Sequence, residues 1–272
     1  MKLPAEVRPE WPESWRLSHK YDRLELGPPD PAHLGYQYSY WARRDATLAL
    51  VARAAPPPAR VLDVAAAQGN LTLTLAERGY RVTWNDLRAD LADYTRLKYE
   101  RGDVDYLAGN ILEQGSKDPW DVVVACEVIE HVAHPDRFLA QLGKLVKPGG
   151  HVVITTPNGG YFRNRLPRFD KCPDPSQFES VQFKPDADGH IFLLHQDELR
   201  SIAAKSGLEL LQVTVLTNPL TNGSLRLRTL LPFVPRNAVT AVERATRALP
   251  GVVTSRIMAT TAALLRRPET SS

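Results

Sequence analysis

The sequence predicts an α/β protein built on a doubly wound, mostly parallel, seven-stranded sheet with helices on both faces. Short apolar runs alternate with helical patterns along most of the 272 residues, and glycine or proline marks many of the boundaries between them. No internal repeat of about 20 to 50 residues is visible, so solenoids and propellers are excluded. Strands that are separated by helices pair in parallel through crossover connections, and such a sheet needs helices over both faces.

The first half of this alternation begins after three consecutive prolines, which close an N-terminal helical cover predicted over residues 1–55. Its strands are apolar, β-branched runs, and its helices carry apolar residues at intervals of three or four. Gly79 ends the first of these helices. The predicted elements are a strand over 60–64, a helix over 71–78, a strand over 81–85, a helix over 89–98 and a strand over 104–108.

The second half contains a long interruption. Residues 158–189 show no periodicity and contain four prolines. A connection of this length is typical of an active-site cover, so we predict an active-site loop over 158–195. A helical insertion is expected over 217–250, with a break at Pro232 and Pro235, and the whole chain is predicted to be a single domain. The predicted elements are a strand over 121–125, a helix over 136–146, a strand over 151–156, a helix over 196–205, a strand over 208–216, a helical stretch over 225–249 and a last strand over 256–265.

Composition excludes several classes of protein. Hydrophobic residues make up 43% and charged residues 24% of the chain, which excludes a disordered or coiled-coil protein. No apolar run reaches about 18 residues, and the N-terminus has no apolar signal core. The two cysteines, Cys126 and Cys172, are too few for a disulfide framework. We therefore expect no membrane span, no export and a cytoplasmic location.

The net charge of +3 is too small to predict a nucleic-acid or membrane partner, but it is unevenly distributed. From residue 217 onward there are eight arginines and two glutamates, so this part carries +6 and the rest carries −3. We interpret the arginines as the solvated face of a helix. An anionic ligand near that face is the alternative.

The turn after the first predicted strand is the place where a doubly wound sheet binds its ligand. Only Gly69 is present there of the three glycines that a dinucleotide fingerprint requires. Asp86 ends the second strand, where a carboxylate can bind both hydroxyls of a ribose. An acidic residue after a strand is also an ordinary helix cap, so neither feature is specific alone. The turn reads Asp63-Val64-Ala65-Ala66-Ala67-Gln68-Gly69-Asn70.

Together with later segments, this turn resembles the class I S-adenosylmethionine-dependent methyltransferases, whose fold is Rossmann-like. The resemblance runs from about residue 40 to 216 and extends toward 265, and it rests on 61–69, Asp86, 109–111, 120–130, 145–150 and 156–158. It implies that S-adenosylmethionine lies along the turn, with its ribose on Asp86 and its adenine beside Asn110 and Ile111. The cofactor-binding residues expected on this basis are Asp63, Ala65, Gly69, Asp86, Asn110, Ile111 and Cys126.

The sequence departs from the family at three positions, two of them in the turn. The family usually has glycine where Ala65 and Ala67 stand, because a missing Cβ lets the backbone approach the ligand or adopt positive φ. We expect the two alanines to loosen cofactor binding or to shift the turn. Asn110, where the family often has Asp, keeps an acceptor for the adenine amine but loses a charge. These departures leave open a non-catalytic binding module on a degenerate methyltransferase scaffold.

A second group of polar residues follows the fourth strand. Glu127 and Glu130 stand three residues apart, with His131 beside them, and polar residues directly after a buried strand are costly unless they serve a site. The alternative to a functional site is that these residues position a helix. With His190, these residues resemble the magnesium site of small-RNA 2′-O-methyltransferases, and the first three also resemble the catechol-methylating ubiquinone-biosynthesis enzymes. The resemblance implies that Glu127, Glu130, His131 and His190 bind Mg²⁺ or Mn²⁺.

A divalent cation lowers the pKa of a neighbouring hydroxyl, which suits methyl transfer to one oxygen of a vicinal diol. We name His134 and His195 as candidates for the general base, although helix capping or packing explains each equally well. Arg43 and Arg44 follow a group of aromatics and are expected to meet the methionine carboxylate, while packing on the sheet explains the aromatics equally well. Those aromatics are Tyr36, Tyr38, Tyr40 and Trp41.

The favoured acceptor is a small-molecule or oligosaccharide diol, because no RNA-binding module is visible. Overall layout and arginine-rich composition resemble the mycobacterial polysaccharide 1-O-methyltransferases, which cap a reducing-end sugar. A catechol or polyketide phenol is the second candidate, since loop aromatics could stack on either kind of ring. These aromatics are Tyr161, Phe162, Phe169, Phe178 and Phe183. RNA ribose methylation is the third candidate, since apart from the arginine-rich tail from residue 217 onward no basic groove interleaved with stacking aromatics is visible. The sequence does not indicate an oligomeric state.

Overall fold

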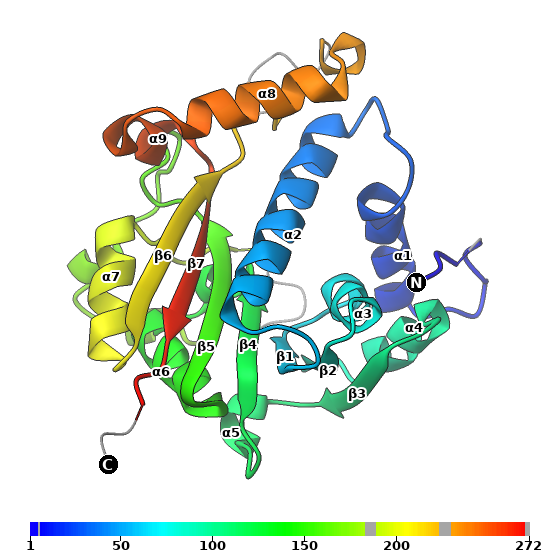
Figure 1. Ribbon diagram of the computed structural model, residues 1–272, viewed down its shortest axis with the longest axis horizontal. Helices are drawn as coiled ribbons and strands as arrows, with labels where there is room; N and C mark the ends of the chain where they lie inside the picture. The colour runs from blue at the N-terminus through cyan, green and yellow to red at the C-terminus, as the bar shows by residue number, and fades with distance from the viewer. Residues whose placement is uncertain (5, 183–188, 223–229, 270–272) are drawn as a thin grey trace.

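The computed structural model describes residues 1–4, 6–182, 189–222 and 230–269, and its core is one seven-stranded sheet in the order β3-β2-β1-β4-β5-β7-β6 (Figure 1). Neighbouring strands from β3 to β5 are parallel, whereas β7 runs antiparallel to both β5 and β6. The predicted doubly wound, mostly parallel sheet is therefore confirmed. The strands are β1 (Arg60–Val64), β2 (Arg81–Asp86), β3 (Asp103–Ala108), β4 (Trp120–Cys126), β5 (Val146–Pro157), β6 (Glu209–Leu216) and β7 (Thr260–Arg266).

Helices cover both faces of the sheet. Leu48 of α2 and Leu75 of α3 belong to the apolar core on one face, whereas Leu139 of α6 and Ile202 of α7 belong to the core on the other. These side chains stand at the apolar positions from which the helices were expected. The helices are α1 (Glu13–Glu25), α2 (Leu34–Ala54), α3 (Asn70–Glu77), α4 (Asp90–Lys98), α5 (Ile111–Gln114), α6 (Pro135–Leu145), α7 (Gln196–Lys205), α8 (Arg236–Arg247) and α9 (Gly251–Ile257).

Two helices, α1 and α2, lie in the region predicted as an N-terminal cover, and they pack against different parts of the protein. Helix α2 packs on β5 and β7 and is part of the layer over the sheet. Helix α1 packs beside α2 and α4, and Trp11, just before it, meets Tyr94 of α4 edge to face with ring centroids 5.8 Å apart. No helix in the described ranges combines the length and the apolar character needed to cross a membrane.

The prediction for the last strand is wrong at its beginning. The strand starts at Thr260 rather than residue 256, because Gly251–Ile257 form helix α9. The β-branched residues there favour a strand, but Pro250 begins a helical turn instead. The helix continues to its end, where the carbonyl oxygen of Thr254 accepts a hydrogen bond from the amide of Met258. The predicted break at Pro232 and Pro235 is confirmed before α8, and residues 225–229 lie outside the described residues.

The predicted active-site loop contains two short 3₁₀ turns, η2 (Phe169–Lys171) and η3 (Pro175–Phe178). Phe169 and Phe178 pack against the fully buried Phe192, with ring centroids 5.3 Å and 5.4 Å away. The expectation that these two rings stack on an acceptor is therefore wrong, since they anchor the loop to the core. Phe183 lies outside the described residues.

Candidate functional site

A cavity of about 250 Å³ lies where β1 and β4 end, at the point where the strand order reverses. Its floor includes Asp63 and Cys126, and its wall is the turn between β1 and α3. Helix α2 contributes four side chains on the opposite side and α1 contributes Glu25. The α2 side chains are Tyr40, Arg43, Arg44 and Thr47. Arg43 and Arg44, which were expected to meet the methionine carboxylate, thus line this cavity, whereas Tyr38 and Trp41 line a separate cavity against α8.

A second cavity of about 50 Å³ adjoins the first, because Ala65 lines both. Asp86, Asn110 and Ile111 line this smaller space, so the structure brings together the residues expected around the ribose and adenine. Gly69 lines neither cavity. It begins α3 with φ +74°, and a Cβ there would come within 2.4 Å of the Thr95 side chain, so glycine is required for packing.

The turn keeps the left-handed conformation that glycine would adopt freely. Ala65 has φ +55° and Ala67 has φ +47°. For a residue with a Cβ this conformation costs roughly 1–2 kcal/mol. The alanines therefore do not convert the turn to another geometry, and the backbone strain is held at the cofactor edge.

The Asp86 carboxylate is buried and already fixed by hydrogen bonds. Its Oδ2 accepts from the amide of Ala67 at 2.9 Å, which joins β2 to the turn between β1 and α3, the predicted cofactor turn. Its Oδ1 accepts from the backbone amide of Arg88 and from the Arg88 side chain. The Arg88 side chain is 37% exposed, so solvent reaches this ion pair.

Two further residues of the predicted cofactor site have strongly raised pKa values. Burial raises the pKa of Asp63 to about 7, although the Thr72 hydroxyl donates to it at 2.6 Å. Burial also raises the pKa of the Cys126 thiol to about 12. Asn110 caps α5, because its Oδ1 accepts from the amide of Leu112.

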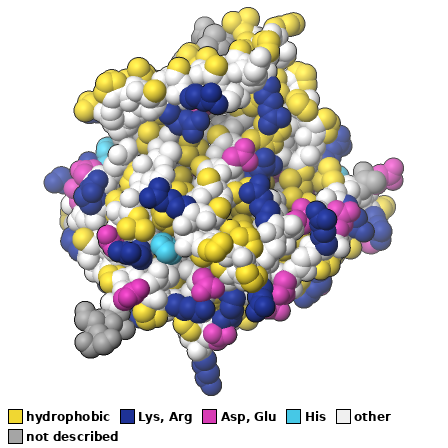
Figure 2. Space-filling view, in the orientation of Figure 1, with side chains coloured by type: hydrophobic (Ala, Val, Ile, Leu, Met, Phe, Trp, Pro, Cys, Tyr) yellow, Lys and Arg dark blue, Asp and Glu magenta, His cyan; other side chains and the backbone are white. Residues whose placement is uncertain are grey.

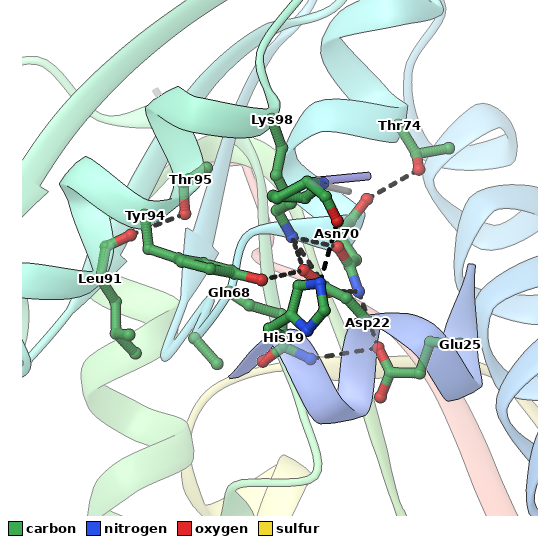
Figure 3. A network of polar contacts seen from close by, with 12 residues as sticks. His19, Asp22, Glu25, Gln68, Asn70, Thr74, Leu91, Tyr94, Thr95 and Lys98 are labelled. Carbon is green, nitrogen blue, oxygen red and sulfur yellow. Dashed lines mark hydrogen bonds and ion pairs between the residues drawn. The ribbon is translucent and has the colours of Figure 1, made fainter. Parts of the chain in front are cut away.

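A buried polar network ties α1 to the cofactor turn (Figure 3). Lys98 Nζ lies 2.9 Å from Asp22 Oδ2 and donates to Asn70 Oδ1 at 2.5 Å. The Asn70 amide nitrogen donates to Asp22 and to Glu25, each at 2.8 Å, and Gln68 also donates to Glu25. Burial raises the pKa of Glu25. Sequence reasoning missed this network, since its partners are separated by up to 76 residues.

The structure brings three of the four predicted metal ligands together. Ligand atoms of Glu130, His131 and His190 lie within 4.8 Å of one another. Glu130 is fully buried, its Oε2 accepts from the Thr156 hydroxyl at 3.0 Å, and its Oε1 has no hydrogen-bond partner in the described part of the chain. The His131 Nδ1 lies 3.0 Å from the Gly189 carbonyl oxygen, which fixes the ring and leaves Nε2 as the ligand atom. This donor set fits a divalent cation.

His190 reaches the cluster because the chain beyond the long loop returns to Glu130. The amide of Ile191 donates to the Glu130 carbonyl oxygen at 2.7 Å, and the His131 and His190 ring centroids are 4.9 Å apart. Burial, together with the charge of Glu127, raises the pKa of Glu130 well above its usual range. A cation at this point would stabilise the ionised carboxylate that burial disfavours.

Glu127 lies aside from the other three. Its φ of +55° is unusual for a residue with a Cβ, and its Oε2 lies 3.4 Å from Arg43 Nη1. It lines the first cavity, so it stands between the cofactor edge and the cluster. Its Oε1 is buried and has no hydrogen-bond partner within the described ranges, which leaves an acceptor available for a ligand.

The two histidines named as candidate bases have structural contacts. His134 begins α6, and its Nε2 lies 2.8 Å from Glu179 Oε1. His195 begins α7, and its backbone amide donates to Glu198. Neither lines the first cavity or belongs to the cluster of Glu130, so their role as base stays a prediction without a supporting contact.

Comparison with known proteins gives relatives over part of the chain. The chain is 36% identical over 106 residues to a ubiquinone biosynthesis O-methyltransferase from Vibrio atlanticus, covering 38% of this chain and 45% of that protein. It is 38% identical over 103 residues to the Klebsiella pneumoniae protein of the same name, covering 36% and 43%. The chain thus matches less than half the length of these relatives.

Structural comparison and a family profile agree on the fold. Phosphoethanolamine N-methyltransferase 2 from Haemonchus contortus, solved in complex with S-adenosyl-L-methionine, aligns with a TM-score of 0.52 at 18% identity, covering 97% of this chain and 62% of that one. This likeness shows the fold alone. The profile of the methyltransferase domain family matches residues 36–213. Because that match spans more than half of the sequence, the chain belongs to the methyltransferase domain family.

Proposed function

We propose that the protein is an S-adenosylmethionine-dependent, divalent-metal-dependent O-methyltransferase that acts on one hydroxyl of a vicinal diol on a saccharide. The observation that carries the proposal is the cluster of Glu130, His131 and His190 beside the cofactor cavities, with a buried carboxylate oxygen that lacks a partner in the described residues. An ordinary structural carboxylate at such a position would have its hydrogen bonds satisfied.

The cofactor residues orient the methyl donor. Asp86 would hold the ribose hydroxyls, Ile111 would border the adenine, and Arg43 and Arg44 on α2 would face the methionine carboxylate. Methyl transfer is a displacement in which the acceptor oxygen forms a bond to the methyl carbon while the sulfur–carbon bond breaks. The products are a methyl ether, S-adenosylhomocysteine and one proton, and most of the rate comes from alignment.

The acceptor side is supplied by the metal-binding residues. Glu130, His131 and His190 would hold Mg²⁺ or Mn²⁺, and such an ion lowers the pKa of a hydroxyl that lies next to it. Glu127 projects between the two parts of the site, where its unpartnered oxygen can accept the hydrogen bond of the acceptor hydroxyl. This position makes Glu127 our candidate for aligning the nucleophile.

A catechol is the second candidate acceptor. The relatives reported above are named ubiquinone biosynthesis O-methyltransferases, which favours an aromatic diol. Phe162 remains available for stacking on either kind of ring, since its side chain is 47% exposed. Both acceptors present two adjacent hydroxyls and differ in the rigidity and acidity of the diol.

The test is transfer of labelled methyl from S-adenosylmethionine to saccharides, catechols and a short RNA, each with Mg²⁺ and with EDTA. We expect Mg²⁺-dependent label in a saccharide. Glu130→Gln and His190→Ala should abolish transfer and weaken Mn²⁺ binding measured by electron paramagnetic resonance, while His151→Ala, on the opposite part of β5, should change neither. Label that survives EDTA would refute the metal dependence, and label only in catechols would support the second candidate. If no acceptor is labelled and S-adenosylhomocysteine does not bind, the protein is a binding module.

A further inference from the structure

Helix α8 is oriented with its polar side toward the protein. The Glu243 carboxylate accepts from the amide of Asn218 at 2.7 Å and from the Thr221 hydroxyl, and the Asn218 side chain donates to the Thr246 hydroxyl. Val239 is the apolar residue of α8 that is buried. Residues on the opposite side of the helix therefore face solvent.

That outward side carries apolar residues together with Asn237, Thr240 and Arg244. Val242 and the alanines beside it are exposed, and the apolar surface continues through Leu249 into α9 and back to the turn before α8. Phe233 is 84% exposed and Val252 is 80% exposed, which is far more than isolated surface residues of this size require. We call this surface the α8–α9 face, and it consists of Leu230, Phe233, Ala241, Val242, Ala245, Ala248, Leu249, Val252 and Val253.

Arginines border the α8–α9 face. Four are exposed in α8 and α9, and none of the four forms an ion pair in the described ranges. Arg236 stacks on the Trp41 ring at 4.8 Å and Arg247 lines the same cavity against α2, so Arg244 and Arg256 are the two that border the face. Figure 2 shows hydrophobic side chains along the band of α8 and α9, with Lys and Arg side chains directly beneath it. Glu243 is the one acidic residue between 230 and 257, and its carboxylate is used inside the protein. The four arginines are Arg236, Arg244, Arg247 and Arg256.

We propose that the α8–α9 face docks on an anionic membrane surface, with its apolar side chains among the acyl chains and with Arg244 and Arg256 at the lipid phosphates. Exposed apolar residues flanked by unpaired arginines, without exposed acids, are the pattern that binds an anionic bilayer. A symmetric contact with a second copy would place the same arginines opposite one another, where like charges repel. Charge therefore favours the lipid surface as the occupant.

The α8–α9 face is attached to the edge of the sheet that carries the candidate site. The Asn158 side chain, just after β5, donates to the carbonyl oxygens of Ser255 and Met258 at 2.8 Å and 2.7 Å. The amide of Phe162 donates to the carbonyl oxygen of Arg256. Since Thr156 of β5 bonds to Glu130, docking would bring the metal-binding cluster close to the bilayer. The docking itself does not depend on the proposed reaction.

The test is co-sedimentation of the full chain with vesicles of phosphatidylglycerol and phosphatidylcholine in equal parts, compared with vesicles of phosphatidylcholine alone. We expect binding to the anionic vesicles only, weakened by added salt. Phe233→Ser combined with Val252→Ser should reduce the partition coefficient about tenfold or more. Arg244→Gln and Arg256→Gln should each reduce it about fivefold. All four side chains are exposed, so the variants should fold.

Matched controls and a second measurement decide the outcome. Leu17→Ser and Arg78→Gln remove an exposed leucine and an exposed arginine far from α8, and they should bind as the unmodified protein does. Equal binding of the α8–α9 variants and the controls, or no binding to anionic vesicles, would overturn the proposal. So would sedimentation velocity showing a dimer without lipid that the Phe233→Ser, Val252→Ser variant dissociates, because the face would then belong to a second copy.

Discussion

Replacement of Lys98 by Met tests whether the buried network of Figure 3 holds the N-terminal cover on the cofactor turn. Lys98 and Asp22 are both fully buried, with Nζ and Oδ2 2.9 Å apart. Methionine keeps most of the volume of the lysine stem but removes the charge. Among the described residues, the Asp22 carboxylate then keeps two neutral donors, the Tyr94 hydroxyl and the Asn70 amide.

The expected loss follows from the burial of the pair. Breaking a buried ion pair costs about 3–5 kcal/mol, because the remaining charge is left in a medium that solvates it poorly. A domain of ordinary stability has about 5–15 kcal/mol in total, so the loss should be large. Asp22→Asn added to Lys98→Met removes the unpaired charge and should recover about 2 kcal/mol, since the amide oxygen still accepts from Tyr94.

The assay is urea unfolding followed by circular dichroism, with free energies taken by linear extrapolation. Lys144→Met is the control, because Lys144 is exposed on α6 and its replacement should change the free energy of unfolding by less than about 0.5 kcal/mol. The reasoning is refuted if Lys98→Met loses less than about 1 kcal/mol. It is equally refuted if the double variant is no more stable than Lys98→Met alone.

Three other predictions concern the cofactor edge. Because the pKa of Asp63 is raised, the folded state keeps a proton that the unfolded state releases. The contribution of this group to stability is therefore full below about pH 3.8 and falls as the pH rises toward about 7. Relative to Asp63→Asn, the free energy of unfolding should drop by about 2–4 kcal/mol across that range. Ala67→Gly should raise the free energy of unfolding by about 0.5–1 kcal/mol, because relief of the strain at φ +47° exceeds the entropic cost of glycine, and a loss in thermal unfolding would contradict this. In calorimetry with S-adenosylhomocysteine, Asp86→Ala should weaken binding at least about tenfold. Arg88→Ala should keep the affinity or improve it by up to about fivefold. An equal loss of affinity in both variants would show that Arg88 contacts the ligand.

Local sequence information was sufficient for most of the sheet. Strands β1 to β5 are apolar runs bounded by turn residues, and their order along the chain required parallel crossovers. It was insufficient for Gly251–Ile257, where β-branched residues favour a strand but a proline-initiated helix packs against the end of β5. Propensity is a weak preference, and tertiary contacts override it.

The sequence by itself placed Asp63 near the end of one buried strand, Asp86 at the end of the next and Glu130 after the fourth, and so predicted that they lie at one edge of the sheet. Only the tertiary structure decided that His190 joins Glu130 and His131 while Glu127 turns to Arg43. The same is true of the network around Lys98 and of the outward apolar side of α8. Strand ends follow from a periodicity of a few residues. Contacts between residues tens of positions apart depend on how the helices and loops pack, and no local pattern encodes that packing.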